Sequence, residues 1–184
     1  MPEPQGTPGA ASPATETTSP TEPTQYGFSY EYGVDIYNKE RDEWQPIRFI
    51  SSVNPTVSPK EVDAATYDDK GADHPVRVGE TPSLSFYVQM HRLETGNFLP
   101  EVEMLLSATR PDAVGSLGVV KVRYYDKPVK GKPNSKEAYE LTATVSVERA
   151  ATGNAELSGW NFTLNGQGAR KTIANPATTN PLPA

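Results

Sequence analysis

The chain has 184 residues, a formal net charge of −6 at pH 7 and no cysteine. Disulfides, thiolate nucleophiles and cysteine-ligated metals all require cysteine, so the sequence excludes these three kinds of chemistry. The acidic balance argues against a protein that holds phosphate backbones over a broad surface, because such binding needs many basic side chains. The 18 prolines and 14 glycines predict abundant turns.

Residues 1–25 differ in composition from the rest of the chain. They contain six prolines and three glutamates but no aromatic or branched aliphatic side chain, so they cannot bury enough apolar surface to offset their conformational entropy. We expect a disordered, weakly acidic N-terminal arm over 1–25 and a flexible tail over 174–184, which leaves 26–173 as one domain. We expect no secretory signal, because the N-terminus has neither a charged n-region nor an apolar h-region. We expect no membrane insertion, because no apolar run approaches the ~20 residues that a membrane span needs.

The start of the domain has the pattern of a β-hairpin. Between Tyr26 and Tyr37, aromatic and aliphatic residues fall on alternate positions, which is the period of a half-buried strand. A polar turn follows over Asn38–Glu43, and the large apolar residues of Trp44–Val53 suit a partner strand. Because no basic residues surround the tyrosines of this stretch, stacking on nucleic acid is disfavoured, and we interpret them as core or subunit-interface residues.

Four later segments also predict strands. Apolar and polar residues alternate in Ser83–Leu93, and Gly115–Tyr125 and Ala138–Arg149 are predicted as a second pair. The turn Lys127–Lys136 between that pair holds four lysines. We interpret it as a solvated hairpin tip, with contact to an acidic patch of a partner as the alternative. A last strand is predicted over Leu157–Asn165.

One segment has the period of a helix instead. In Leu99–Arg110, the apolar residues Val102, Leu105 and Leu106 recur at helical spacing, and Pro100 suits the first helical position. The fold class is therefore mainly β with one short helix, which we expect to pack on the sheet through these three side chains.

The segment Asn54–Pro82 shows neither period, although it lies between two clear strands. It is much longer than the ~12–15 residues beyond which connections without secondary structure become uncommon. Valines and a tyrosine are spread through it, which argues against disorder. The sequence therefore predicts a long, ordered and functional connection.

Little in the sequence suggests catalysis or metal binding. His74 and His91 are the two histidines, and no metalloprotease, nucleophile-elbow or phosphate-loop motif accompanies them. The acidic run Asp63–Asp73 fails the EF-hand pattern: with Gly71 at the sixth position of the loop, the twelfth position is Arg77 rather than the required glutamate. We expect no catalytic residue, no metal site and no cofactor; a looser calcium site in that run and a small β-fold hydrolase are the alternatives.

Several segments occur in a characteristic order. A tyrosine-rich opening strand and a W-x-x-I-x-x-I strand (Trp44–Ile50) precede the block Asn54–Arg92, and a short helix PEVEMLL (Pro100–Leu106) follows it. A pair of long strands and the segment WNFTLNGQG (Trp160–Gly168) close the chain. The ordered set, over about 26–173, resembles the major tail tube proteins of long, non-contractile-tailed phages, especially those that infect actinobacteria. The N-terminal arm departs from that pattern.

The resemblance implies an antiparallel β-sandwich or half-barrel of the tail tube type, with one short helix and a long inter-subunit loop. It implies hexameric rings that stack into a tail tube, through which genomic DNA passes without specific binding. The implied partners are further copies of the chain and the tail terminator, tape measure and tail tip proteins of the virion. The implied location is the virion tail, after assembly in the host cytoplasm.

The resemblance also places the contacts between subunits in the long connection. The residues expected near these contacts are Asp63, Thr66, Tyr67, Asp68, Asp69 and Lys70. A candidate lumen face is the polar side of the strand Ala138–Arg149, an assignment that competes with an ordinary solvated face. Its members are Glu140, Thr142, Thr144, Ser146 and Glu148. The alternative to a tube subunit is a non-catalytic β-sandwich that acts as a binding or capsid-decoration module.

Overall fold

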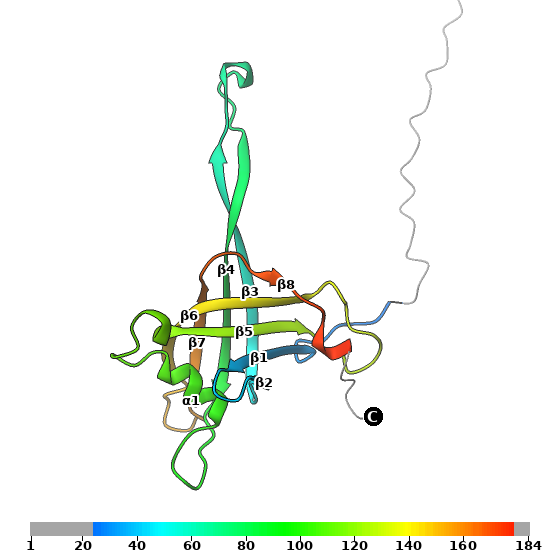
Figure 1. The fold of residues 1–184 in the computed structure, drawn as a ribbon. Helices are drawn as coiled ribbons and strands as arrows, with labels where there is room; N and C mark the ends of the chain where they lie inside the picture. Colours follow the sequence, from blue (N-terminus) through cyan, green and yellow to red (C-terminus); the bar gives the residue numbers. More distant parts are fainter. Residues whose placement is uncertain (1–23, 179–184) are drawn as a thin grey trace, which may run out of the picture.

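One antiparallel sheet of eight strands forms the framework of the protein in the computed structural model, which describes residues 24–178 (Figure 1). Seven strands follow the order β2-β1-β5-β6-β7-β4-β3, and β8 pairs with β6. The strands are β1 (Tyr32–Asn38), β2 (Glu43–Pro46), β3 (Ile50–Asp63), β4 (Pro75–Gln89), β5 (Val119–Asp126), β6 (Ala138–Ala150), β7 (Gly159–Gly166) and β8 (Lys171–Thr172). The helical elements of the described residues are α1 (Pro100–Ser107) and the 3₁₀ turns η1 (Tyr67–Asp69), η2 (Gly115–Gly118) and η3 (Pro176–Thr178). The predicted mainly antiparallel β fold with one short α-helix is confirmed.

The long strand β6 bends the sheet over on itself. Its first part, Ala138–Thr144, pairs with β5, and its second part, Ala143–Ala150, pairs with β7. In Figure 1, β1, β5 and β6 run across the molecule while β3 and β4 run along it. A strand shared by two crossing parts of a sheet forms a corner between them, so the bent sheet can enclose its own core.

The core lies between the two parts of the sheet. Alternate side chains of the strands point into it, as the period of two requires. The buried strand residues include Val34, Ile36, Leu84, Phe86, Val88, Val122, Tyr124, Leu141, Phe162 and Leu164. The helix α1 adds Val102 and Leu105, which are 1% and 0% exposed, and the partly buried Leu106 packs beside them. The helix therefore lies where the sequence predicted it, with the predicted side chains in the core.

A buried carboxylate ties α1 to β2 and to the segment that follows it. Glu101 is fully buried and accepts hydrogen bonds from Arg48 Nε at 2.7 Å and Gln45 Nε2 at 3.1 Å. Its place in the first turn of α1 also suits a negative charge. Removal of one partner from such a pair leaves an uncompensated buried charge, so this contact holds the helix in one position.

Two strand predictions near the N-terminus need correction. Residues 26–31 of the predicted strand Tyr26–Tyr37 lie before β1, and their aromatic side chains are exposed. The predicted strand Trp44–Val53 is divided between β2 and β3. Phe49 has a left-handed backbone with φ of 56°, which interrupts an extended chain.

Part of the expected C-terminal tail is held against the sheet. Asn175 is 2% exposed, and its Nδ2 donates to the carbonyl oxygens of Asp126 and Asn134, both at 2.9 Å. One amide thus satisfies the carbonyl of Asp126 at the end of β5 and that of Asn134 in the β5–β6 turn, which anchors residues 174–178 of the expected tail. The rest of that tail and almost all of the N-terminal arm lie outside the described residues. No helix within 24–178 is long and apolar enough to span a bilayer.

Candidate assembly surfaces

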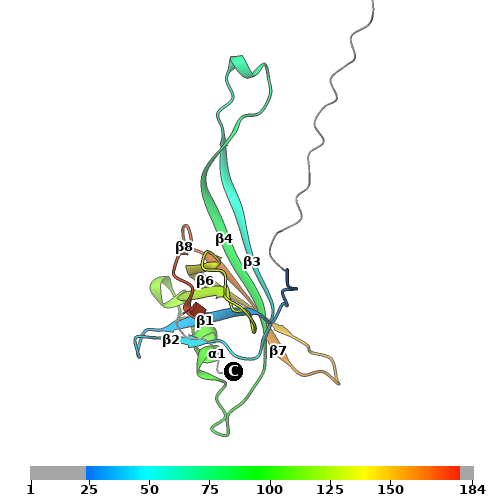
Figure 2. The same ribbon diagram turned by 90° about the vertical axis from the view of Figure 1, so that its right-hand side faces the viewer.

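Strands β3 and β4 extend beyond the rest of the sheet as a two-stranded ladder. Strand β4 pairs with β7 from Ser83 to Gln89, whereas Pro75–Pro82 pairs with β3 alone. At about 3.3 Å per residue, this free ladder is about 25 Å long. Figures 1 and 2 show it standing clear of the other strands. We call residues 57–82 the projecting hairpin. The rest of the sheet, which includes the remaining parts of β3 and β4, forms the body together with α1.

The structure corrects the predicted form of segment 54–82, which is mostly strand rather than an irregular connection. Apolar and polar residues do not alternate in this segment, for a physical reason. A ribbon that pairs only with itself exposes both faces, so neither face requires a continuous row of apolar side chains. The irregular part is confined to the tip, residues 64–74, where it contains η1.

Close packing and ion pairs hold the root of the hairpin. A Cβ atom on Gly166 of β7 would lie 2.7 Å from Pro82 Cγ, so glycine permits the close approach of the two strands. Glu80 pairs with Arg77 at 2.8 Å and with Arg170 at 3.5 Å. The guanidinium of Arg170 in turn lies 4.0 Å from the ring centre of Tyr139. These contacts fix the direction in which the hairpin leaves the body.

Three valines are exposed on the outer part of the hairpin. Val62 and Val76 are direct cross-strand partners and are 50% and 43% exposed. Val78, which is 56% exposed, is the extra residue of a β-bulge, since Gly79 pairs with Lys60 and Arg77 with Glu61. A lone two-stranded hairpin is only marginally stable in water. Exposed β-branched side chains on such a hairpin favour a surface that another chain covers.

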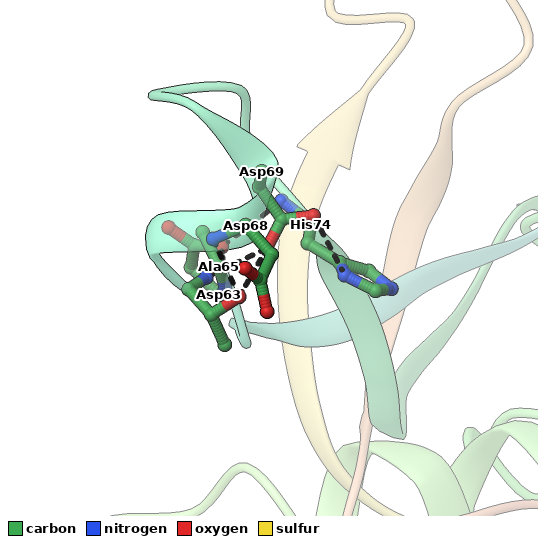
Figure 3. Close-up of polar contacts among 6 residues, drawn as sticks. Asp63, Ala65, Asp68, Asp69 and His74 are labelled. Carbon is green, nitrogen blue, oxygen red and sulfur yellow. Dashed lines mark hydrogen bonds and ion pairs between the residues drawn. The ribbon is translucent and has the colours of Figure 1, made fainter.

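The carboxylate of Asp63 closes the tip of the hairpin (Figure 3). Its Oδ1 accepts hydrogen bonds from the backbone N–H of Ala65 at 2.9 Å and of His74 at 3.0 Å. These bonds, that from His74 first, hold the pKa of Asp63 below its ordinary value. His74 Nδ1 also lies 3.5 Å from Asp69 Oδ1. The tip is thus joined across its two strands by side chains that the sequence predicted to lie near a contact.

A capping box orders the middle of the tip. Thr66 is the N-cap of η1: its Oγ1 accepts from the N–H of Asp68 at 3.3 Å, while Asp69 Oδ2 accepts from the N–H of Thr66 at 2.7 Å. The latter bond is the main reason that the pKa of Asp69 lies below its ordinary value. Lys70 ends η1 with a left-handed backbone, and Tyr67 is fully exposed. All six predicted contact residues therefore meet at the end of the hairpin.

The tip carries an excess of negative charge. Residues 61–74 contain five carboxylates and one lysine. Asp63 and Asp69 are engaged by backbone N–H groups, whereas Glu61, Asp68 and Asp73 make no ion pair with any part of the chain that the structure describes. The three unpaired carboxylates and the exposed Tyr67 are therefore available to a partner.

The candidate lumen face is a continuous polar surface on β6. Thr142, Thr144, Ser146 and Glu148 are exposed, while Glu140 is half-buried and pairs with Lys121 at 3.0 Å. The strands on either side continue this face with polar side chains: Lys121, Arg123, Asn161, Thr163 and Asn165. The face is therefore polar but mixed in charge, which the sequence of β6 alone did not reveal.

A second surface joins two segments that are far apart in the chain. The residues before β1 contribute the exposed Tyr26, Phe28 and Tyr30, and the β5–β6 turn contributes the exposed Val129, Lys130 and Lys132. These side chains line a hollow of about 420 Å³. We call the six residues the lysine–aromatic surface.

Glu31 clamps the two halves of this surface together. Its carboxylate accepts from the N–H of Phe28 and from the N–H of Val129, both at 3.0 Å, and these bonds lower its pKa. Its carbonyl accepts from the N–H of Lys127 at 3.0 Å. The sequence interpretation, in which the tyrosines lacked basic neighbours, is therefore wrong for Tyr26 and Tyr30. Glu31 and Val129 lie 98 positions apart, so no local pattern indicated their meeting.

The two histidines lie in different surroundings. His74 is an exposed tip residue, and His91 stacks on Phe49 with ring centroids 3.7 Å apart. His91 Nε2 also lies 3.0 Å from Gln89 Oε1. Within residues 24–178, no group of three or more histidine or carboxylate side chains is arranged to hold a metal ion.

No protein-family model and no curated protein matches the chain. The fold does match solved structures. A chain from the tail of an empty gene transfer agent particle, refined with C6 symmetry, superimposes with a TM-score of 0.58 at 12% identity, and the match covers 82% of this protein and 100% of that chain. A chain from the virion of a native gene transfer agent particle gives 0.55 at 11% identity with the same coverage. At these identities the likeness shows a shared fold, which is one found in a particle tail.

Proposed function

We propose that this protein is a structural subunit of the tail of a phage or phage-like particle. The observation that carries the proposal is the match of its fold, over the full length of the compared chain, to a chain from a C6-symmetric gene transfer agent tail. The projecting hairpin supports it, because exposed valines and unpaired carboxylates on an extended ladder suit contact with another subunit. Such a role requires no catalysis.

The finer proposal follows the sequence resemblance. In it, six copies form a ring, and rings stack into the tail tube of a long, non-contractile tail of the kind found in phages of actinobacteria. The tube delivers genomic DNA without binding it specifically. Its partners are the tail terminator, tape measure and tail tip proteins, and it resides in the virion tail after assembly in the host cytoplasm.

The two surfaces predicted from the sequence have separate roles in this proposal. The hairpin tip, with Asp63, Thr66 and Tyr67–Lys70, contacts neighbouring subunits. The polar face of β6 lines the lumen, where paired charges such as Glu140 and Lys121 avoid strong attraction for phosphate. Ring contacts of this kind are heterologous and close after a fixed number of subunits.

Electron microscopy of the purified full-length chain tests the proposal. The protein is concentrated stepwise, its mass is followed by sedimentation velocity, and samples are imaged in negative stain. We expect rings or tubes with sixfold symmetry above a threshold concentration. A chain that stays monomeric at every concentration and binds glycans or a capsid surface instead would favour the binding or capsid-decoration module.

A further inference from the structure

We propose that the lysine–aromatic surface is the docking site for the tip of the projecting hairpin of a second copy of this chain. The inference rests on the proposed function, because it concerns contacts within the same assembly. It identifies the receiving surface for the hairpin: the sequence offered contact of the lysine-rich turn with an acidic patch only as an alternative, and neither the aromatic half of the surface nor its occupant was assigned.

Charge complementarity is the first argument for this occupant. Lys130 and Lys132 are exposed, and neither makes an ion pair within residues 24–178. The two carboxylates that line the hollow are already engaged, since Glu31 accepts from backbone N–H groups and Asp126 Oδ2 accepts from the N–H of Asn134 at 2.7 Å. The surface therefore presents unpaired positive charge, while the hairpin tip presents unpaired negative charge. Complementary charges of this kind steer association and fix its register.

Apolar complementarity is the second argument. Phe28 and Tyr30 stack with ring centroids 5.3 Å apart and an interplanar angle of 5°, which makes a flat aromatic platform. The tip offers the fully exposed Tyr67, with Val62 and Val76 behind it on the ladder. Aromatic side chains are enriched in the centre of protein interfaces because they bury a large area. Both partners thus carry an apolar centre beside a charged rim.

The platform is also held ready for a partner. Glu31 bonds to both halves of the surface, and Asn175 fixes the β5–β6 turn through the carbonyls of Asp126 and Asn134. A surface that is already ordered loses little conformational entropy when a partner binds. The sequence interpreted the lysine-rich turn as a solvated tip, with contact to an acidic patch of a partner as the alternative, and the ordered turn favours that alternative.

The position of the two surfaces requires a second copy. Figures 1 and 2 show the hairpin extending away from the body, whereas the β5–β6 turn lies at the body, so the tip does not reach this surface within one chain. Two complementary but different patches on one molecule make a heterologous contact. Such contacts propagate into closed rings or open helical assemblies, which agrees with the proposed stacking.

A charge-swap experiment on the full chain tests the contact. One variant reverses the surface (Lys130→Glu with Lys132→Glu), another reverses the tip (Asp68→Lys with Asp73→Lys), and a third combines all four changes. Lys39→Glu with Lys171→Glu is the matched control for the surface reversal, since it makes the same two Lys→Glu changes outside both surfaces. Sedimentation velocity at physiological salt gives the concentration at which half of the protein is assembled, and circular dichroism verifies folding.

We expect each reversal to raise the half-assembly concentration by about tenfold or more, and the combined variant to restore it to within about threefold of the parent. The control should behave as the parent. Three results would each overturn the inference: reversed variants that assemble normally, a combined variant that assembles no better than the single reversals, or a control that is equally impaired. In each of these cases the parent still assembles, so the proposed function stands. A parent that never assembles would overturn both.

The same variants test another occupant of this surface. Binding of a single-stranded DNA 20-mer that the lysine reversal abolishes, with assembly unchanged, would assign the surface to nucleic acid and overturn the inference.

Discussion

The body and the projecting hairpin are both antiparallel sheet, yet different forces hold them. In the body, strand residues alternate between a buried face and an exposed face, and the buried side chains meet α1 in one core. In the hairpin, no residue between 57 and 81 is buried. Its conformation depends on the backbone ladder, the ion pairs of Glu80 and the carboxylates of the tip.

On the proposed function, this difference would separate folding from assembly within one chain. The body obtains its stability from apolar burial, so it does not need the hairpin. The hairpin leaves its valines and Tyr67 uncovered, so its apolar surface is free to contribute to contact with another chain. Substitutions in the two regions should therefore affect different measurements.

The largest effect is expected from Leu105→Asp in α1. Leu105 is 0% exposed, so the carboxylate would be buried among apolar side chains, and we expect a loss of more than about 4 kcal/mol or no soluble fold at all. Leu157→Asp is the matched control, since Leu157 is 74% exposed; its effect should stay within about 0.5 kcal/mol. Urea unfolding measures both, and equal stabilities would show that α1 is not part of the core.

Replacement of Asp63–Asp73 by a short Gly/Ser linker should abolish assembly but not folding. The replaced residues include no buried side chain, so the thermal midpoint of the body should change by only a few degrees. Size-exclusion mass and negative-stain images report assembly, and circular dichroism reports folding. Normal polymerisation of this variant would mean that the hairpin tip is ordinary surface.

The same conservative swap should act differently in the two regions. Val62→Thr with Val76→Thr keeps the β-branched shape, so the free energy of unfolding should change by less than about 0.5 kcal/mol, while assembly weakens through loss of apolar contact. Val88→Thr, at a position that is 0% exposed, buries a hydroxyl group in the core and should cost about 1–3 kcal/mol of stability. If both variants lower the free energy of unfolding by the same amount, the hairpin is stabilised by apolar burial as the body is.

The smallest effect is expected from acid, and it should be confined to the tip. Because the pKa of Asp63 and that of Asp69 are lowered in the folded chain, their hydrogen bonds stabilise the tip above the ordinary aspartate pKa. That stabilisation is lost as the pH falls through the lowered values. Amide resonances of Ala65, Thr66 and His74 should therefore shift at low pH before those of the core strands. Simultaneous shifts in body and tip would contradict this order.

The body was predictable from the sequence, because burial leaves a pattern. Alternation located the body part of β4, Ser83–Gln89, and most of β5, β6 and β7. The spacing of Val102, Leu105 and Leu106 located α1 with the right face inward. The strand predictions that were wrong mostly concern residues whose side chains are not buried. Tyr26, Phe28 and Tyr30 alternate like strand residues but are exposed.

The candidate surfaces were only partly predictable, for reasons that differ between them. The tip residues were located by composition and resemblance, but their hairpin was not, since an unburied ladder has no period. The lysine–aromatic surface was missed because one hydrogen-bonded carboxylate, Glu31, brings distant segments together. Asn175 was missed because its two carbonyl partners are visible only in three dimensions.

The ladder between β4 and β7 has a mechanical consequence. Strand β4 continues from the hairpin into the body, where Ser83–Gln89 pairs with β7. Antiparallel hydrogen bonds lie perpendicular to their strands, so a pull on the hairpin along its axis loads this whole set in shear rather than opening it one bond at a time. The root of the hairpin is thus built to resist tension, and a tether that joins subunits would transmit an axial force into the sheet without detaching from it.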